Sequence, residues 1–284
     1  MTGFQRLSTA PWRAMTRLLV LGALVLGFMP GPALAAELKL LCAELPPFCY
    51  HDPSPIRTAV GERQGQAKGI VYDAVKAMAA RIGHSGRIEF MGWTVAQQLA
   101  QSGSNIGILA LTRSPNREPY YRWLVEIYQD DLLLVGTPGV DVTSLEAVRD
   151  RPVGVLRTSG AQALLREENF TRIKPRAQEW MNALDLYERQ IDAWLGPRLM
   201  ILYAYREIGA DPSALSFGPI IRPSPIYLAA SPDVSEAEGE RWQKAFDEIQ
   251  ADGTYKRILA NYRYPTVEPI PVDVLRRESI QWGY

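Results

Sequence analysis

The sequence predicts an α/β protein built from two similar units in series. Apolar segments of strand length alternate with segments whose apolar residues recur at helical spacing. Two of the predicted strands, 106–111 and 152–156, each end in a small polar turn that leads into a helix. At 284 residues the chain is long enough for two lobes that each bury a core.

The first unit is predicted as strand, helix, strand, helix, strand. Gly69 opens a helix with apolar residues at helical spacing up to Ile82, and Gly83 ends it. The segment 52–68, which carries Pro, Gly, Arg and Gln, is predicted as a surface excursion. The predicted elements are strand 38–43, helix 69–82, strand 87–91, helix 93–101, strand 106–111 and a further strand 131–136.

The second unit repeats this alternation. Thr143 to Glu146 fits a capping box that begins a short helix, and Ser235 begins a long one in the same way. Pro197 is predicted as the first residue of a helix. The predicted elements are strand 152–156, helix 161–168, helix 182–190, strand 191–196, helix 197–208, strands 216–221 and 226–230, and helices 235–250 and 254–261.

The N-terminal residues differ from the rest of the chain. A basic start with three arginines precedes an uncharged apolar run, 18–29, which Pro30 ends. Ala33-Leu34-Ala35 then gives the spacing that signal peptidase recognises. Residues 1–35 are therefore predicted to be a secretory signal peptide, with the exported protein beginning at Ala36. The apolar run is shorter than the roughly 20 residues that a membrane-spanning helix needs.

Composition excludes several classes of function. Lys+Arg and Asp+Glu are equal at 31 each, which argues against nucleic acid as a partner bound through bulk charge. Two histidines and no Cys-x-x-Cys argue against a metal site, and no dinucleotide-binding or phosphate-binding glycine motif indicates a cofactor. The two cysteines, Cys42 and Cys49, are interpreted either as a disulfide of an exported protein or as two buried thiols.

The segment from Thr112 to Arg117 is the strongest candidate for a binding site. It lies where a strand's carboxyl end meets a helix start, which is where open α/β sheets bind ligands. Backbone N–H groups there favour anions, and a guanidinium holds a carboxylate through two parallel hydrogen bonds. The alternative interpretation is an ordinary surface loop with solvated arginines.

Several stretches in a fixed order resemble the type 2 periplasmic solute-binding proteins that serve amino-acid ABC importers (bacterial extracellular solute-binding protein family 3). These stretches are 45–48 (L-P-P-F), 69–75 (G-I-V-Y-D-A-V), 112–117 (T-R-S-P-N-R), 153–155 with 158–160 (V-G-V and T-S-G), 191–193 (I-D-A) and 251–255 (A-D-G-T-Y). The resemblance implies two lobes with mixed, mostly parallel sheets, joined by two hinge strands and closing on a ligand. Lobe 1 would comprise 36–131 and 228–284, and lobe 2 would comprise 132–227.

The resemblance also implies site residues. The residue matching Arg117 clamps the ligand's carboxylate, and those matching Ala110 and Thr112 add a backbone and a hydroxyl contact. Ser159 and Gly160 would reach the same carboxylate from lobe 2, and Trp93 would supply an aromatic wall. All of these residues follow from matching this sequence to the family's motifs.

Some positions depart from the family's pattern. The family's ammonium-binding Asp falls on Pro197, which leaves Glu44 as the nearest acid to take that role. The turn of lobe 2 carries Arg157, where small or polar residues are usual. Burying an ammonium without a carboxylate costs several kcal/mol, so a carboxylate or other anionic solute is as plausible as an amino acid.

The leading hypothesis is a monomeric periplasmic binding protein that captures a small carboxylate-bearing solute for the membrane permease of an ABC importer, without catalysis. A first alternative is an enzyme on the same fold, a dehydratase of cyclic carboxylic acids, with Glu44 or His51 as acid or base. His51 is otherwise interpreted as an exposed loop histidine without a partner. A second alternative is a ligand sensor or partner-binding protein with no role in transport.

Overall fold

The computed structural model describes residues 1, 3, 37–52 and 65–262. The predicted signal peptide, most of the predicted excursion and the end of the chain lie outside the described residues. The ends of that excursion form a hairpin, which corrects the prediction. Strands β2 (Tyr50–Asp52) and β3 (Gln66–Lys68) pair antiparallel, with His51 opposite Ala67.

The described chain contains an eight-stranded mixed sheet in the order β4-β1-β5-β10-β6-β9-β7-β8. Strands β4, β1 and β5 are mutually parallel, and so are β8, β7 and β9. The strands, in sheet order, are β4 (Ile88–Phe90), β1 (Lys39–Cys42), β5 (Ile106–Thr112), β10 (Ser216–Ala230), β6 (Arg122–Gly136), β9 (Ala193–Pro197), β7 (Val153–Leu156) and β8 (Ile173–Arg176). The predicted mixed α/β architecture is confirmed.

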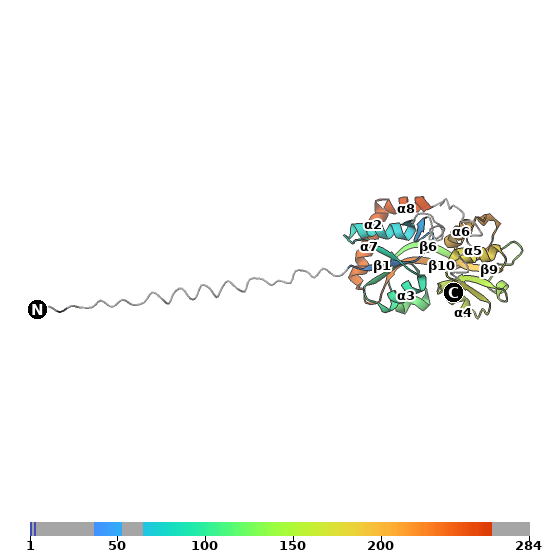
Figure 1. Ribbon diagram of the computed structural model, residues 1–284, viewed down its shortest axis with the longest axis horizontal. Helices are drawn as coiled ribbons and strands as arrows, with labels where there is room; N and C mark the ends of the chain where they lie inside the picture. The colour runs from blue at the N-terminus through green and yellow to red at the C-terminus, as the bar shows by residue number, and fades with distance from the viewer. Residues whose placement is uncertain (2, 4–36, 53–64, 263–284) are drawn as a thin grey trace. The chain divides into compact units, whose positions relative to one another are not determined.

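Two long strands, β6 and β10, connect the two parallel groups. Each has 15 residues, and they pair antiparallel from Arg122 with Ala230 to Gly136 with Ser216. At one end β10 pairs with β5, and at the other β6 pairs with β9. Figure 1 shows both strands passing from one group of helices to the other. We use "first lobe" for 37–131 and 228–262, and "second lobe" for 132–227, following the predicted boundaries, which stay a prediction.

Strand β10 is continuous, so the prediction of two separate strands, 216–221 and 226–230, is wrong. Pro223 and Pro225 lie in the part of β10 that was not predicted as strand, and proline lacks the N–H that a sheet ladder needs. The Pro225 carbonyl accepts from the Arg113 N–H, so this edge of β10 faces β5, and β5 joins the β10 ladder only from Ile226 onward. Pro223 and Pro225 come before that point on the same edge of β10. The sheet therefore loses no ladder hydrogen bond through their missing N–H groups.

The helices lie where apolar spacing predicted them, within a few residues. In the first lobe they are α2 (Ile70–Arg81), α3 (Trp93–Ser102), α7 (Glu236–Ala251) and α8 (Thr254–Tyr262), and in the second α4 (Gly160–Glu167), α5 (Glu179–Tyr187) and α6 (Arg198–Glu207), with 3₁₀ turns at Pro115–Tyr120, Glu146–Val148 and Pro212–Ala214. The predicted Thr143 box is wrong in detail, because Ser144 Oγ accepts from the Ala147 N–H at 3.1 Å. The Ser235 cap is confirmed, since its Oγ accepts from the Glu238 N–H at 3.2 Å.

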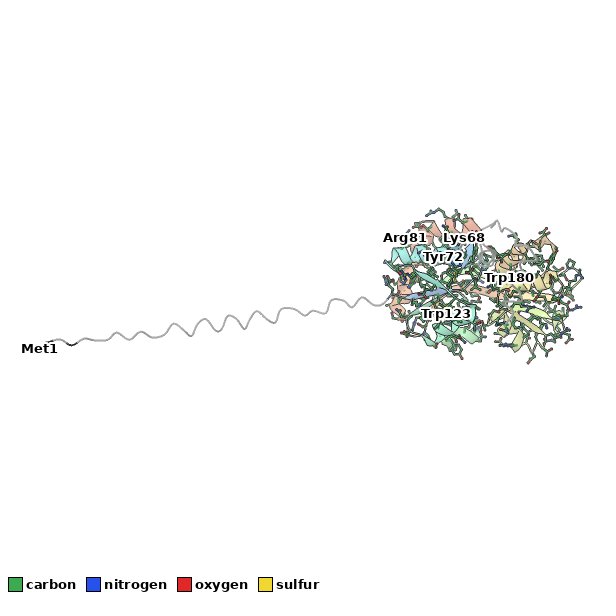
Figure 2. The ribbon with its side chains drawn as sticks, in the orientation of Figure 1. Met1, Lys68, Tyr72, Arg81, Trp123 and Trp180 are labelled. Carbon is green, nitrogen blue, oxygen red and sulfur yellow. A yellow bond between two sulfur atoms is a disulfide. The ribbon has the colours of Figure 1, made fainter. Side chains whose placement is uncertain are left out.

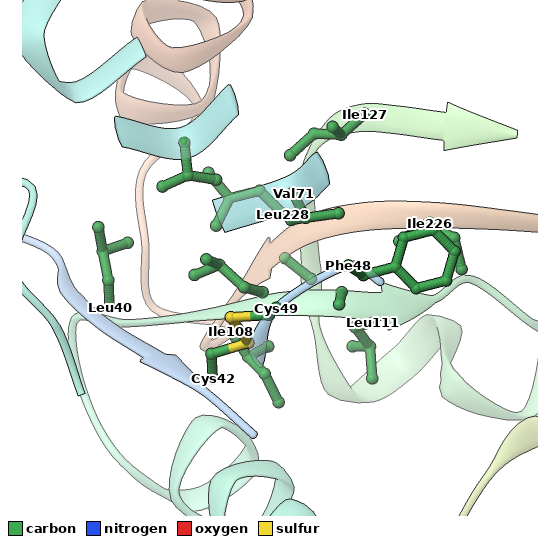
Figure 3. Packing of buried hydrophobic residues seen from close by; sticks show 14 of the residues in the cluster. Leu40, Cys42, Phe48, Cys49, Val71, Ile108, Leu111, Ile127, Ile226 and Leu228 are labelled. Atoms are coloured by element: carbon green, nitrogen blue, oxygen red, sulfur yellow. A yellow bond between two sulfur atoms is a disulfide. The ribbon is translucent and has the colours of Figure 1, made fainter. Parts of the chain in front are cut away.

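Apolar side chains form three buried clusters. The largest is built mainly from residues 38–127 and 226–262, and two smaller ones from residues 132–221. Figure 3 shows Leu40, Ile108 and Leu228 of the largest cluster around the Cys42–Cys49 disulfide. Figure 2 shows Trp123 and Trp180 on different sides of the described chain, one in each lobe. The clusters hold in place the strand ends that carry the predicted site residues.

Candidate functional site

Arg117 is a buried cation that faces only neutral acceptors among the described residues. Strand β5 ends at Thr112, and the 3₁₀ turn Pro115–Tyr120 follows it. Arg117 lies in this turn with its side chain directed inward and 8% of its surface exposed. Its guanidinium donates to the Thr112 carbonyl at 3.0 Å, to Gln97 Oε1 at 2.8 Å and to the Thr158 carbonyl at 2.9 Å. Burial, together with nearby Arg222, lowers the pKa of Arg117 to about 10. A buried cation of this kind attracts an anion.

The turn of the second lobe meets the first lobe at Thr158. Its backbone lies in the left-handed region, with φ 56°, and Ser159 caps α4 by accepting from the Gln162 N–H at 3.1 Å. The Thr158 hydroxyl lies 3.2 Å from the Thr94 hydroxyl and accepts from Gln97 Nε2 at 3.1 Å. Sequence reasoning missed Gln97, although a polar residue one helical turn after Trp93 on a buried face was a signal.

The predicted site residues divide among three cavities. Glu44, Trp93 and Arg157 share the largest, of about 370 Å³. Arg117 and Ser159 line one of about 250 Å³, and Thr112, Ser159 and Gly160 line one of about 30 Å³ beside Pro197. Ala110 lies in the first lobe's core with φ 59° and lines none of these three. The residues that the resemblance placed around one carboxylate are therefore not gathered in one cavity.

The largest of these three cavities, which we call the Glu44 cavity, has walls from both lobes. Its lining residues are Ala43, Glu44, Phe90, Met91, Gly92, Trp93, Thr94 and Val95 from the first lobe, and Arg157, Ala177 and Gln178 from the second. Trp93 Nε1 is buried without a hydrogen-bond partner among the described residues. A buried donor without a partner is uncommon in folded proteins. The cavity thus offers a carboxylate and a guanidinium to a small solute.

His51 contacts Glu44 through two groups, which corrects the interpretation of His51 as an exposed loop residue. Its backbone N–H donates to Glu44 Oε2 at 3.1 Å, and its ring Nδ1 lies 2.5 Å from Glu44 Oε1. The ring also packs against Phe90, with centroids 4.2 Å apart, and only 19% of the side chain is exposed. The contact was missed because the hairpin that places His51 beside Glu44 was not predicted.

The loop that carries Glu44 is fixed by the Cys42–Cys49 disulfide. The two Cα atoms are 6.6 Å apart and both residues are fully buried. Inside this loop the Leu45 N–H donates to the Cys49 carbonyl at 2.7 Å, so the chain reverses direction at once. Glu44 therefore projects from a covalently closed loop rather than from a free segment.

The resemblance matches Pro197 to the family's ammonium-binding Asp, which stays a prediction, and an acid from β6 lies near the start of the helix that follows Pro197. Asp130 Oδ2 accepts from the Leu199 N–H at 3.1 Å, near the start of α6. Burial raises the pKa of Asp130 to about 6. Sequence reasoning missed this residue, which satisfies a helix N-terminus and lines none of the three cavities.

No group of three or more His, Cys, Asp or Glu side chains is arranged to hold a metal ion in the described part of the chain. Within those same ranges, none of the helices has the length and apolar character needed to cross a membrane.

Comparison with known proteins supports the resemblance. No family model matches the chain. It is 21% identical over 207 residues to the "Probable amino-acid-binding protein YxeM" of Bacillus subtilis strain 168, a match that covers 71% of this chain and 78% of that protein.

Similar solved structures show the fold. They include a histidine kinase sensor domain with similarity to periplasmic binding proteins (TM-score 0.68, 16% identity, covering 82% of this chain and 99% of that one). The GluR0 ligand-binding core of Nostoc punctiforme, in complex with L-glutamate, has a TM-score of 0.68 and 15% identity, covering 81% of this chain and 100% of that one.

A Streptococcus pneumoniae substrate-binding protein of an ABC uptake transporter, with bound histidine, has a TM-score of 0.67 and 13% identity, covering 81% of this chain and 94% of that one. The chain therefore has the two-lobed α/β fold of periplasmic binding proteins, as its motifs predicted. The reported relatives include a probable amino-acid-binding protein and a substrate-binding protein, which agrees with the prediction of a non-enzymatic protein.

Proposed function

We propose that this protein binds a small, carboxylate-bearing solute, an amino acid or a related organic acid, in the Glu44 cavity. The observation that carries the proposal is the pairing of Glu44 and Arg157 in one cavity of about 370 Å³, each contributed by a different lobe. Opposite charges on two walls suit a molecule with a cationic nitrogen at one end and a carboxylate at the other.

Arg157 and Arg117 have separate roles in this proposal. Arg157 lines the Glu44 cavity and binds the carboxylate, whereas Arg117 holds the Thr158 turn that carries Arg157 into place. The resemblance assigned the carboxylate to Arg117, and that assignment stays a prediction.

The predicted signal peptide supports an exported protein, and the similarity to proteins of ABC uptake systems supports delivery of the solute to a membrane permease. We propose that the protein acts as a monomer in the periplasm. Transport is tested by radiolabelled uptake in cells with and without the gene, once a solute is known.

The binding test is a thermal-shift screen of the purified protein against amino acids, dicarboxylates and cyclic acids. A solute at a hundred times its dissociation constant adds about 2.7 kcal/mol to the free energy of unfolding, which raises the melting temperature clearly. Arg157→Gln is expected to abolish the shift. Arg113→Gln is the matched control, because Arg113 occupies the corresponding turn of the first lobe, pairs with Glu118 at 2.7 Å and lines none of the three cavities.

The Arg117→Gln variant distinguishes the role proposed for Arg117 from the role proposed for Arg157. Loss of the shift in the Arg157 variant, with a reduced shift in the Arg117 variant, supports the proposal. Loss in the Arg117 variant alone returns the carboxylate to Arg117. A screen in which no compound shifts the melting temperature overturns the proposed function and favours the sensor or partner-binding alternative.

A further inference from the structure

A second cavity, which we call the Arg166 cavity, also has walls from both lobes. Its volume is about 250 Å³, and every described residue that lines it is neutral or cationic. The first lobe contributes the amide of Asn116, the hydroxyl of Tyr120 and the guanidinium of Arg117, and the second lobe contributes Gln162 and Arg166. Two cations therefore share a polar cavity to which the described chain brings no carboxylate.

The charge of Arg117 is not balanced by its hydrogen-bond partners. Its guanidinium donates to two backbone carbonyls and to Gln97 Oε1, all of which are neutral acceptors. Arg222, another cation, lies near enough to lower the pKa of Arg117 further. Burial disfavours an unbalanced charge, so an anion in the adjoining cavity stabilises the charged form of Arg117.

Arg166 is the second cation, and α4 gives it no acid to pair with. It lies in the last turn of this helix and is exposed. The residues three and four positions before it, which are its neighbours on the helix surface, are Ala163 and Gln162. Arg176 in the same lobe, by contrast, pairs with Asp185 at 2.6 Å. The guanidinium of Arg166 is therefore available to a bound ion.

From these observations we propose that the Arg166 cavity binds a small oxyanion with two negative charges, such as sulfate or hydrogen phosphate. Guanidinium groups bind oxyanions through paired, charge-assisted hydrogen bonds, and two of them match a doubly charged ion. A volume of about 250 Å³ lies below the roughly 300–1,000 Å³ of pockets for larger ligands, which suits an ion of this size.

The oxyanion is a second ligand, separate from the solute of the proposed function. The Glu44 cavity and the Arg166 cavity share none of their described lining residues, so both are able to be filled at once. The inference therefore stands or falls independently of the proposed function.

A bound oxyanion connects the two lobes beside the turn that carries Thr158. Tyr120 ends the 3₁₀ turn of the first lobe, and Arg166 belongs to α4 of the second. The Thr158 carbonyl accepts from Arg117 across the same boundary, at 2.9 Å. An ion held by Tyr120 and Arg166 adds contacts on both sides of this boundary and so favours the arrangement in which the lobes meet there.

Calorimetric titration of the purified protein with sodium sulfate, and separately with sodium phosphate, tests the inference at neutral pH. Sodium chloride keeps the ionic strength constant, because screening weakens the attraction of an exposed cation for an anion. Saturable binding of a single ion is expected. Arg166→Gln keeps a polar side chain without the charge and is expected to weaken this binding about tenfold or more.

The matched control is Arg189→Gln. Arg189 is another exposed arginine of the second lobe and lines none of the three cavities, so this variant removes the same charge away from the proposed site. The affinity for sulfate is expected to stay unchanged. An equal loss in the two variants assigns the binding to the net charge of the lobe and overturns the inference.

Tyr120→Phe tests the contribution of the first lobe. Loss of its hydroxyl is expected to weaken sulfate binding about threefold or more. Tyr187→Phe is the control, because Tyr187 has the same exposed fraction of 54% and lines none of the three cavities. Unchanged binding in Tyr120→Phe overturns the position of the ion between the lobes. Absence of saturable binding by both anions, or equal binding in the wild type and Arg166→Gln, overturns the site, and neither result affects the solute screen.

Discussion

Replacing Glu179 by glutamine is expected to stabilise the protein at neutral and alkaline pH and to change little in acid. Glu179 is the first residue of α5 and is buried in the second lobe. Its Oε2 accepts from Asn182 Nδ2 at 2.8 Å and from Trp194 Nε1 at 3.0 Å, while Oε1 has no partner among the described residues. Burial raises the pKa of this carboxyl from 4.5 to about 7.

The direction of this pH dependence of stability follows from proton linkage. The folded state holds the Glu179 proton more tightly than the unfolded state, so its stabilising contribution is complete below about pH 4.5 and is lost as the pH rises to about 7. A rise of the pKa from 4.5 to about 7 corresponds to about 3 kcal/mol. Glutamine mimics the protonated acid at every pH, so Glu179→Gln is expected to gain up to about 3 kcal/mol above pH 7.

Urea denaturation at about pH 4.5 and about pH 8 measures this difference. The control is Glu167→Gln, at the exposed end of α4, which is expected to leave the pH profile unchanged. If Glu179→Gln lowers stability equally at both pH values, Glu179 is ionised and satisfied in the folded state, and the argument from burial is refuted.

Two further predictions concern the loop that positions Glu44. A Cβ at Gly69 would lie 2.3 Å from the Phe48 carbonyl oxygen, with φ at +138°, so Gly69→Ala is expected to lower the free energy of unfolding by about 3 kcal/mol. Gly83→Ala, at φ +68° with open space around it, isolates the backbone strain and should cost about 1 kcal/mol in the same denaturation assay, and equal losses would rule out the clash. Replacing Cys42 and Cys49 together by alanine should cost about 2 kcal/mol through the loss of a short closed loop, and detection of two free thiols in the unreduced, denatured wild type would show that no disulfide forms.

The sequence predicted the helices well because their signals are local. The apolar spacing of α2 and the Ser235 cap of α7 each lie within one element, and both predictions are confirmed. The lengths of strands β6 and β10 were underestimated. Each is a continuous strand because it pairs with the other over its whole length, which neither segment indicates by itself. Whether Pro223 breaks a strand depends on which edge needs its N–H, and only the sheet order decides that.

The site was less predictable than the fold because its contacts join distant parts of the chain. Glu44, Trp93 and Arg157 were each identified from sequence, and the structure places them around one cavity. The partners that define their chemistry were not identified. Gln97 meets Thr158 across 61 positions, and no pattern within either segment encodes that contact.

The resemblance predicts that Arg117 binds a carboxylate, but in the structure Arg117 donates to the carbonyl of Thr158. In the structure the Thr158 carbonyl, a neutral acceptor, lies 2.9 Å from the guanidinium and occupies one of its donors. A solute carboxylate is a stronger acceptor, because a hydrogen bond between two charged groups is roughly twice as strong as one between neutral groups. A carboxylate that takes the place of this carbonyl on Arg117 also moves the turn that carries Arg157. The two arginines are therefore coupled through Thr158, and Arg117→Gln is expected to alter how Arg157 meets the solute.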